Sequence, residues 1–282
     1  MDRPNHTHWL DLLKWLLPIS LVMACPGLTL AQEGSDDLRS KVQNPVSSLY
    51  SLPFKFTFDN GAANGNANFL NIQPVIPVTV GDWNLVNRII APVIDAPGNV
   101  PGLPAVPSPS PGPRATGLGD INYSLFFSPV KYDKLIWGVG PSVMMPTASE
   151  SQLGSGKWSV GPTAVFLTQP KWGSMGILGR QLWSVAGDSA RADVNQTLIE
   201  PFLNYNLDKG WYLIADLIIT ANWQATSGNE WTVPLGGGVG KIMKFGQQPV
   251  NLRAEYYYNV VKPLGAPEWQ VGFTMQFMFP RK

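Results

Sequence analysis

The chain has 282 residues with a net charge of +1, and only 14% of its residues are charged. A soluble domain usually carries about a quarter charged residues, and a chain without a basic stripe is not expected to bind nucleic acid. Beyond the N-terminus no apolar run reaches the roughly 18 residues of a membrane-spanning helix. Abundant Trp, Phe, Tyr and Gly in short alternating segments instead favour an all-β fold.

The N-terminus resembles an export signal. Arg3 and Lys14 precede a short apolar run over residues 15–24, and Thr29-Leu30-Ala31 is a small-x-small cleavage site. We therefore expect residues 1–31 to be a signal peptide. A buried core helix is the alternative interpretation of the apolar run.

The fate of Cys25 depends on where this signal is cut. Val22-Met23-Ala24-Cys25 resembles a lipobox, which would leave Cys25 lipidated at the N-terminus. Cleavage after Ala31 would instead remove Cys25, the only cysteine, together with His6 and His8, the only histidines. The mature chain would then have no disulfide, thiol or imidazole chemistry.

Residues 211–223 show most clearly the pattern that the rest of the chain repeats. Trp211, Leu213, Leu217 and Trp223 share one face of a period-two pattern, and the other face admits Asp216. About twelve residue steps of roughly 3.3 Å, tilted by about 40°, separate the two indoles by about 30 Å along a membrane normal. This predicts a transmembrane β-strand with a lipid face and a wetter face.

After residues 32–48, which are polar and expected to form a flexible periplasmic N-terminal segment, about twelve such strands follow. They are predicted at 49–59, 68–80, 82–94, 118–129, 134–146, 157–168, 173–184, 195–206, 210–223, 231–244, 249–261 and 267–279. The links between them alternate between long and short, as in a barrel with tight periplasmic turns and longer external loops. We predict an all-β, membrane-spanning antiparallel up-and-down β-barrel of about 12 strands over residues 49–282, in the bacterial outer membrane. Pairing of the last strand with the first would remove the open apolar edge.

Residues 95–117 form the longest link and are rich in proline, glycine and serine. Such a run favours extended, polyproline-like backbone that has few donors for a sheet. We expect an external surface loop, with recognition by a proline-binding domain as the alternative.

Ionisable residues on the inward face of the predicted strands are the main functional candidates, because charge inside a membrane barrel is tolerated only toward a wet or paired interior. Arg180, Glu200 and Asp216 lie on three successive strands, so we expect them to approach one another. They would form either a charged constriction that selects cargo or a salt-bridge cluster that only braces the lumen. The candidate lumen residues are Lys55, Arg88, Asp120, Arg180, Glu200, Asp216, Arg253 and Glu255.

Tryptophans recur near the ends of the predicted strands. This placement favours anchoring at the two membrane interfaces over binding of an aromatic solute. The candidates are Trp83, Trp137, Trp158, Trp183, Trp211, Trp223, Trp231 and Trp269.

No motif of the predicted barrel indicates catalysis, a metal or a cofactor. Without histidine, neither a Ser-His-Asp hydrolase nor a histidine metal site can form; a Ser-Lys mechanism stays open. Residues 236–241 (GGGVGK) resemble a phosphate loop, but Ile242 stands where Ser or Thr is required. We interpret Gly236, Gly238 and Gly240 as lumen positions that leave room for side chains from across the barrel. The chain is therefore not expected to be an enzyme.

Six stretches together carry a family resemblance. They are TGLGD at 116–120 leading into 123–129, GVGPSVMMP at 138–146, QLWSVAGD at 181–188, NQTLIEPFLNYNL at 195–207, WTVPLGGGVGK at 231–241 and EYYYNV at 255–260. In these the chain resembles the MetA-pathway phenol-degradation family of bacterial outer-membrane proteins, described as transporters. The resemblance covers most of the chain after residue 49. It implies an outer-membrane barrel that passes small, hydrophobic or aromatic molecules, and it does not account for the proline-rich link.

We therefore expect an outer-membrane channel for small solutes, with outer-membrane lipid and an unidentified small molecule as its partners. The alternative is a barrel that does not transport and acts through its external loops, as an adhesin or assembly partner. A barrel of this size is narrower than a porin of sixteen to eighteen strands, so large side chains can nearly fill it.

Overall fold

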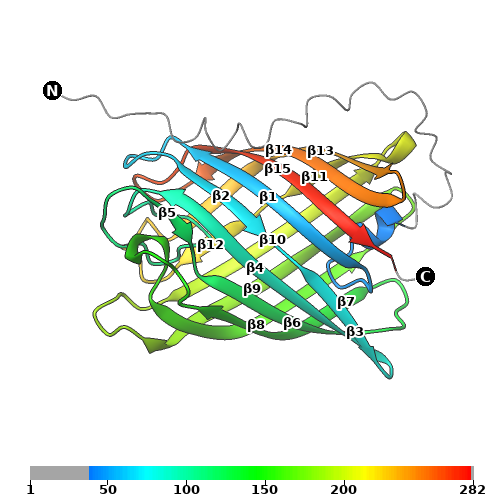
Figure 1. Ribbon diagram of the computed structural model, residues 1–282, viewed down its shortest axis with the longest axis horizontal. Helices are drawn as coiled ribbons and strands as arrows, with labels where there is room; N and C mark the ends of the chain where they lie inside the picture. The colour runs from blue at the N-terminus through cyan, green and yellow to red at the C-terminus, as the bar shows by residue number, and fades with distance from the viewer. Residues whose placement is uncertain (1–37, 281–282) are drawn as a thin grey trace.

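The computed structural model describes residues 38–280, which form a closed antiparallel β-barrel (Figure 1). Fifteen strand segments make twelve barrel strands, because β2 continues into β3, β5 into β6, and β11 into β12. Strand β15 pairs with β1 in one register from Tyr50↔Phe279 to Asn60↔Trp269, which closes the cylinder. The predicted all-β barrel of about twelve strands is confirmed, whereas the predicted signal peptide and Cys25 lie outside the described residues.

The strand bounds follow the period-two segments closely. They are β1 (Tyr50–Asn60), β2 (Ala67–Ile72), β3 (Val75–Val80), β4 (Trp83–Ala96), β5 (Ala115–Leu118), β6 (Ile121–Pro129), β7 (Ile136–Met145), β8 (Lys157–Thr168), β9 (Gly173–Gly187), β10 (Asn195–Asn206), β11 (Trp211–Asp216), β12 (Ile219–Asn222), β13 (Trp231–Phe245), β14 (Gln248–Val261) and β15 (Trp269–Phe279). Two short 3-10 helices lie in the links, η2 (Ser151–Leu153) and η3 (Asp208–Gly210). Within the described residues, no helix is long and apolar enough to cross a membrane.

Proline divides the predicted strand 68–80, and a bulge joins the predicted strand 118–129 to β5, which begins at Ala115 inside the predicted link 95–117. Pro74 separates β2 from β3, although both keep one register with β4, because proline has no N–H to donate to the ladder. Between β5 and β6 the register with β4 shifts by one residue at Gly119 and Asp120. This one-residue shift is a bulge, and it turns Asp120 toward the external loops.

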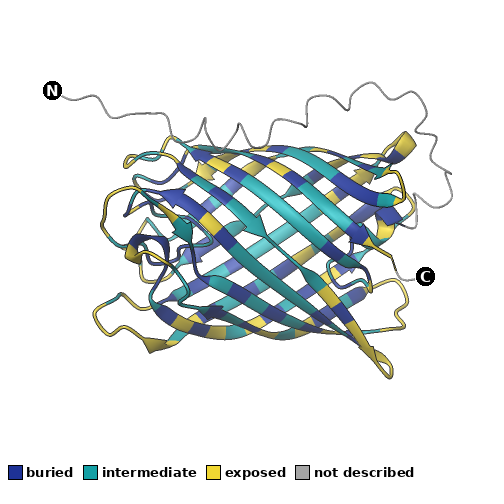
Figure 2. Ribbon diagram, in the orientation of Figure 1, coloured by how far each residue is buried: buried dark blue, intermediate teal, exposed yellow. Residues whose placement is uncertain are grey.

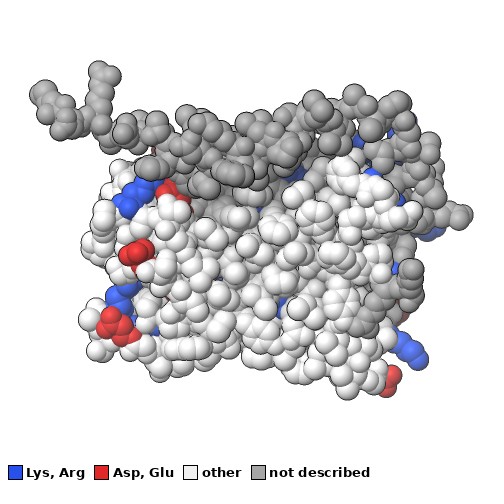
Figure 3. Space-filling model, viewed as in Figure 1, with Lys and Arg blue, Asp and Glu red and all other residues white. Residues whose placement is uncertain are grey.

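The outer surface of the barrel is apolar between its two ends. Leu213 on β11 and Phe273 near the middle of β15 are 50% and 48% exposed. In the space-filling view, charged side chains gather at the two ends of the visible face and the area between them is almost free of charge (Figure 3). Buried and exposed positions alternate along the strands (Figure 2). This is the surface that a lipid bilayer requires of a spanning barrel.

Aromatic side chains lie near both ends of this apolar surface. Trp83 packs edge-to-face on Trp137 with ring centroids 5.9 Å apart, beside the short turns. Trp223 packs in the same way on Trp231 at 5.5 Å, beside the longer loops. These four of the eight tryptophan candidates lie at strand ends, as the sequence indicated. The pair at each end of the barrel matches an interfacial aromatic girdle.

The segment before β1 differs from the flexible lead-in that its polar composition indicated. Residues 38–42 are helical, and Leu38, Val46 and Leu49 are buried. The Arg39 guanidinium donates to Leu207 O at 2.8 Å, and Gln43 Nε2 donates to Asn206 Oδ1 at 2.9 Å. Residues 38–49 therefore fold against the end of the barrel that carries the short turns, because apolar side chains spaced among the polar ones pack on its inner wall. The link lengths predict that this end faces the periplasm, so we call it the periplasmic end and the opposite end the external one.

The proline-rich link also differs from the surface loop expected for it. Val100, Leu103 and Val106 are at most 4% exposed and pack in one cluster with residues of β2, β4 and η2. Asn222 Nδ2 donates to Pro107 O at 3.1 Å, and Ser108 Oγ donates to Asp193 O at 3.1 Å. Residues 97–114, which we call the proline-rich loop, thus lie across the external mouth, where they can bury apolar side chains that a projecting loop would expose.

Candidate functional site: the barrel lumen

A cavity of about 290 Å³ occupies the lumen. Val42, Gln43 and Pro45 of the N-terminal segment line its periplasmic end, and Pro104 and Ala105 of the proline-rich loop line its external end. Side chains of the barrel strands form the wall between these ends. The lumen is therefore bounded at both ends by chain that folds inward.

Seven of the eight predicted lumen residues line this cavity: Lys55, Arg88, Asp120, Arg180, Glu200, Asp216 and Arg253. The eighth, Glu255, is 4% exposed and does not line the cavity. It lies beside Arg253, whose Nη2 donates to both of its carboxylate oxygens at 2.8 Å. The period-two pattern placed these residues on the correct face because a strand alternates its side chains strictly.

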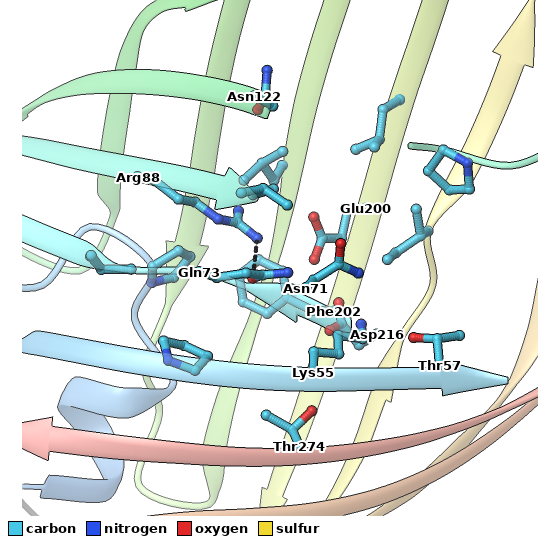
Figure 4. Close-up of a pocket in the computed structure, with 18 of the residues that line it drawn as sticks. Lys55, Thr57, Asn71, Gln73, Arg88, Asn122, Glu200, Phe202, Asp216 and Thr274 are labelled. Carbon is cyan, nitrogen blue, oxygen red and sulfur yellow. Dashed lines mark hydrogen bonds between the residues drawn. The ribbon is translucent and has the colours of Figure 1, made fainter. Parts of the chain in front are cut away.

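Glu200 and Asp216 form the centre of the charged lining. They lie on the neighbouring strands β10 and β11, and both side chains line the cavity (Figure 4). Lys55 of β1 extends from the other side of the lumen toward the same space (Figure 4). The three groups therefore bring charges of both signs to one part of the lining.

Arg253 connects this centre to a second group of polar residues on the wall. Its Nη2 lies 3.0 Å from Asp216 Oδ2, and Tyr257 OH donates to Glu255 Oε1 at 2.9 Å. The Tyr257 hydroxyl also accepts the backbone N–H of Asp216 at 2.9 Å. A buried ion pair gains stability when further polar atoms of its members are bonded, and here Arg253 Nε also donates to Glu255 Oε2 at 3.1 Å.

The glycines of β13 make room for this group. A Cβ on Gly240 would lie 2.1 Å from the Tyr212 ring, so only glycine fits beside that ring. Tyr212 belongs to the adjacent strand β11, rather than to the opposite wall as the sequence interpretation proposed. Tyr212 OH then donates to Asn251 Oδ1 at 2.7 Å.

The expected contact among Arg180, Glu200 and Asp216 forms only in part. Arg180 Nη1 donates to Asn122 Oδ1 at 2.9 Å instead of to either carboxylate. Arg88 in turn lies 3.5 Å from Gln73 Oε1 (Figure 4). The guanidinium groups of Arg180 and Arg88 thus contact amide oxygens, and neither donates to Glu200 or Asp216 in a contact within hydrogen-bond distance.

Asp120 lines the cavity but is tied to an external loop. Its Oδ2 accepts hydrogen bonds from Ser155 N at 2.6 Å and from Ser155 Oγ at 2.7 Å, and its Oδ1 accepts one from Ala148 N at 3.3 Å. A carboxylate that accepts several protein donors is committed to holding that backbone. Asp120 therefore positions residues 146–156 and does not belong to the charged centre of Glu200 and Asp216.

Several lining residues were not among the candidates. Asp59 is 7% exposed and shares the inward period of Lys55 on β1, so the pattern contained a signal for it. Asn71, Asn122 and Thr274 also line the cavity. They are polar but not ionisable, whereas the sequence candidates are all ionisable residues. The contributions of the N-terminal segment and the proline-rich loop had no periodic signal at all. No group of three or more potential metal ligands occurs among residues 38–280.

The wall beside Asp216 has an interrupted ladder. β11 pairs with β13 from Trp211↔Lys241 to Ile214↔Gly238, and pairing resumes only at Thr220↔Thr232 of β12. Pro234 and Gly236 lie in the interruption on β13. Proline lacks a donor and glycine lacks a side chain, so the ladder is weak at this depth. Ile218 faces the cavity on one side, and Leu235 is 61% exposed on the other.

No family model matches the chain, and no curated protein matches it. Among solved structures, an outer-membrane channel from Pseudomonas putida F1 is similar with a TM-score of 0.56 and 15% identity, over 82% of this chain and 94% of that chain. The Pseudomonas putida toluene transporter TodX has a TM-score of 0.43 at 10% identity, covering 85% and 92% of the two chains. LpxR from Salmonella typhimurium has a TM-score of 0.41 at 10% identity, covering 81% and 100%.

The first of these similarities shows a shared barrel fold, and the other two are too distant to extend it. The closed barrel, its apolar outer surface and its aromatic girdles together have the form of a protein of the bacterial outer membrane. The phenol-degradation family is not shown by any of these similarities and stays a prediction from the sequence.

Proposed function

We propose that the chain is an outer-membrane channel for small, mostly apolar solutes, aromatic compounds among them. The observation that carries the proposal is the lumen cavity, bounded at both ends by inward-folded chain. Its volume of about 290 Å³ suits a small molecule, since a cavity of about 150 Å³ holds benzene. A wide aqueous pore for sugars or peptides would need more strands or an empty lumen.

The lining offers a solute both apolar and polar contacts. Phe69, Phe126, Phe202, Ile214 and Ile218 share the cavity with the charged residues. Small-molecule sites combine apolar walls with polar groups that fix orientation, so the apolar part of this lining suits an aromatic body and the polar part suits a polar substituent. The resemblance to a phenol-degradation family points to the same class of cargo.

The interrupted ladder beside Asp216 offers such a cargo a sideways path. Backbone that lacks ladder partners at membrane depth is tolerated where it lines a cavity. Here it separates the lumen at Ile218 from the lipid-facing Leu235. An apolar solute leaving between β12 and β13 would enter the membrane without passing the N-terminal segment.

Uptake by whole cells tests the function. Cells that express the chain should take up radiolabelled toluene several-fold faster than cells that do not express it. Their uptake of glucose should not change. Cells with an impaired outer membrane serve as the control for toluene entry that does not need the channel. Uptake of toluene that is unchanged, although the barrel is folded in the membrane, would reject the proposal.

The alternative role, through external loops, has less support. The apolar residues of the proline-rich loop are buried against the barrel instead of facing a partner. An adhesin would present such residues outward, where they can contact another molecule.

A further inference from the structure

A second cavity, of about 360 Å³, lies at the external end of the barrel. The proline-rich loop forms one side of it through Pro101, Leu103, Pro107 and Pro109. The ends of β10 and β12 and the external links at 223–230 and 262–268 form the other side. It is lined by different residues from the lumen cavity, so it is a separate place for a ligand.

Gln196 provides an unpaired hydrogen-bond acceptor in this cavity. It lines the cavity and is 4% exposed, yet its Oε1 has no hydrogen-bond partner among the described residues. Leu198 and Glu200, at the next inward positions of β10, line the lumen, which places the Gln196 side chain on the inner face. A buried amide oxygen without a partner costs free energy, so a ligand that donates to it is favoured.

The loop side of the cavity provides apolar contact, and the opposite side adds the polar side chains of Thr220, Asn222, Thr226 and Asn229. The prolines and Leu103 present ring and methyl carbons, and Leu264 is 90% exposed at the rim. Glu230 also lines the cavity, with its Oε2 accepting a hydrogen bond from Gly228 N at 2.9 Å. An apolar wall beside a buried acceptor without a partner fits a molecule that has an apolar body and one hydroxyl group.

The proline-rich loop is held in a fixed shape around the cavity. Gly102 has a φ of +77°, and a Cβ there would lie 2.6 Å from Thr232 Oγ1, so glycine is required for this approach to β13. Asn222 fixes Pro107, and Arg114 fixes the end of the loop through an ion pair with Asp95. Because the walls are already ordered, a ligand does not have to order them on binding.

We propose that this cavity is an external binding site for a small neutral molecule with an apolar body and a hydroxyl group, which donates to Gln196 Oε1. The site goes beyond the proposed channel function, since it defines where and how a solute is first bound. It also explains why the loop carries prolines: they form a rigid apolar wall. Binding is measured without transport, so failure of this proposal and failure of the channel function are separate results.

Fluorine NMR of two matched probes tests the site on the folded barrel in lipid nanodiscs. The probes are 4-fluorobenzyl alcohol and its methyl ether, which differ in the hydroxyl donor. We expect the alcohol to bind about three- to tenfold more tightly than the ether, the range for one neutral hydrogen bond. Empty nanodiscs give the partition of each probe into lipid, which is subtracted.

Two substitutions and one control locate the binding. Gln196→Leu removes the acceptor and should make the alcohol and the ether bind equally. Gln270→Leu makes the same change in the lumen cavity, which Gln270 lines, and should leave the preference intact. Ala225→Trp fills the site from an external link and should weaken both probes at least tenfold, even where Gln196→Leu fails to fold.

Three results would overturn the proposal. The first is a preference for the alcohol that survives Gln196→Leu. The second is unchanged binding in the Ala225→Trp variant. The third is tighter binding of 4-fluorobenzylammonium than of the alcohol, lost on Glu230→Gln, which would assign the site to cations.

Discussion

Lys55, Glu200 and Asp216 come from three strands and bring opposite charges to the lining of the lumen. Asp216 is paired with Arg253 at 3.0 Å. Charged groups in a lumen tune the passage of ions even where the main cargo is neutral. Substituting these residues should therefore change the ion selectivity of the channel, which can be measured even if its natural solute carries no charge.

Substituting Glu200 or Lys55 should shift ion selectivity in opposite directions. A unit charge about 5 Å from a passing ion changes its energy by roughly 0.8 kcal/mol even at the dielectric constant of water, which is a factor of about four in occupancy. Glu200→Gln should therefore make the channel more anion-selective and Lys55→Gln more cation-selective. Reversal potentials in a salt gradient across a planar bilayer measure both.

Lys134→Gln is the matched control for these substitutions. Lys134 is exposed in the periplasmic turn between β6 and β7, away from the lumen. Equal reversal potentials for all three variants would show that the Lys55 and Glu200 charges only brace the wall.

The proline-rich loop is the element that closes the external mouth, and its base is held by Asp95. Arg114 pairs with this carboxylate, Thr116 Oγ1 donates to it at 2.7 Å, and Asn68 Nδ2 donates to it at 3.2 Å. Asp95 is 3% exposed, so these bonds form away from water. Charge-assisted bonds of this kind are the strong ones in proteins.

Asp95→Ala should therefore release the loop and raise ion conductance. The substitution removes several hydrogen bonds to one charged group, each contributing roughly 1.5–3 kcal/mol. The fraction of time that the channel is open, with the loop released, should therefore rise at least tenfold. Single-channel recording measures this fraction. Asp82→Ala, in the exposed turn before β4, is the control and should record like the unsubstituted chain.

The interrupted wall between β12 and β13 is the second element with a testable role. Leu217 and Leu235 would be opposite each other if the register of β11 and β13 continued through the interruption. A disulfide at these positions, which needs Cα atoms within about 7 Å, would hold the two strands together. The double variant Leu217→Cys, Leu235→Cys should lose most toluene uptake when oxidised and regain it on reduction.

Ion conductance distinguishes a blocked sideways path from general damage to the barrel. Because the disulfide would lie in the wall and not in the lumen, ion conductance should be the same in the oxidised and reduced forms. Toluene uptake that is unaffected by a formed disulfide would show that the solute leaves by another path.

At the scale of the whole molecule, the closed cylinder separates a lipid face from a lumen face. Phe273 and Gln276 lie on the same strand, β15; Phe273 is 48% exposed on the outside, and Gln276 lines the lumen. Arginine on the lipid face costs about 2–4 kcal/mol near the bilayer midplane. A lumen position should accept the same side chain at a much lower cost.

Phe273→Arg should therefore lower the free energy of unfolding by about 2–4 kcal/mol, and Gln276→Arg by much less. Denaturant titration of the barrel in lipid vesicles measures the two values. Equal losses for the two variants would contradict the assignment of the faces.

Local pattern by itself determined the strands and their faces. The twelve predicted segments match the barrel strands within a few residues, and seven of eight charged candidates line the cavity. Both follow from the strict alternation of side chains along a strand, which depends only on neighbours in sequence. The sorting of link lengths by parity likewise predicts which end faces the periplasm, and that assignment stays a prediction.

Only the tertiary structure decided what fills the barrel and which charges meet. Residues 38–49 and 97–114 have no periodic pattern, and they fold inward because the finished cylinder offers apolar surface to Val46 and Leu103. The pairing of Asp216 with Arg253, two residues from non-adjacent strands, depends on how the sheet curls round the lumen. Such contacts join distant parts of the chain, so they stabilise the protein only after the barrel has closed, and no local sequence pattern predicts them.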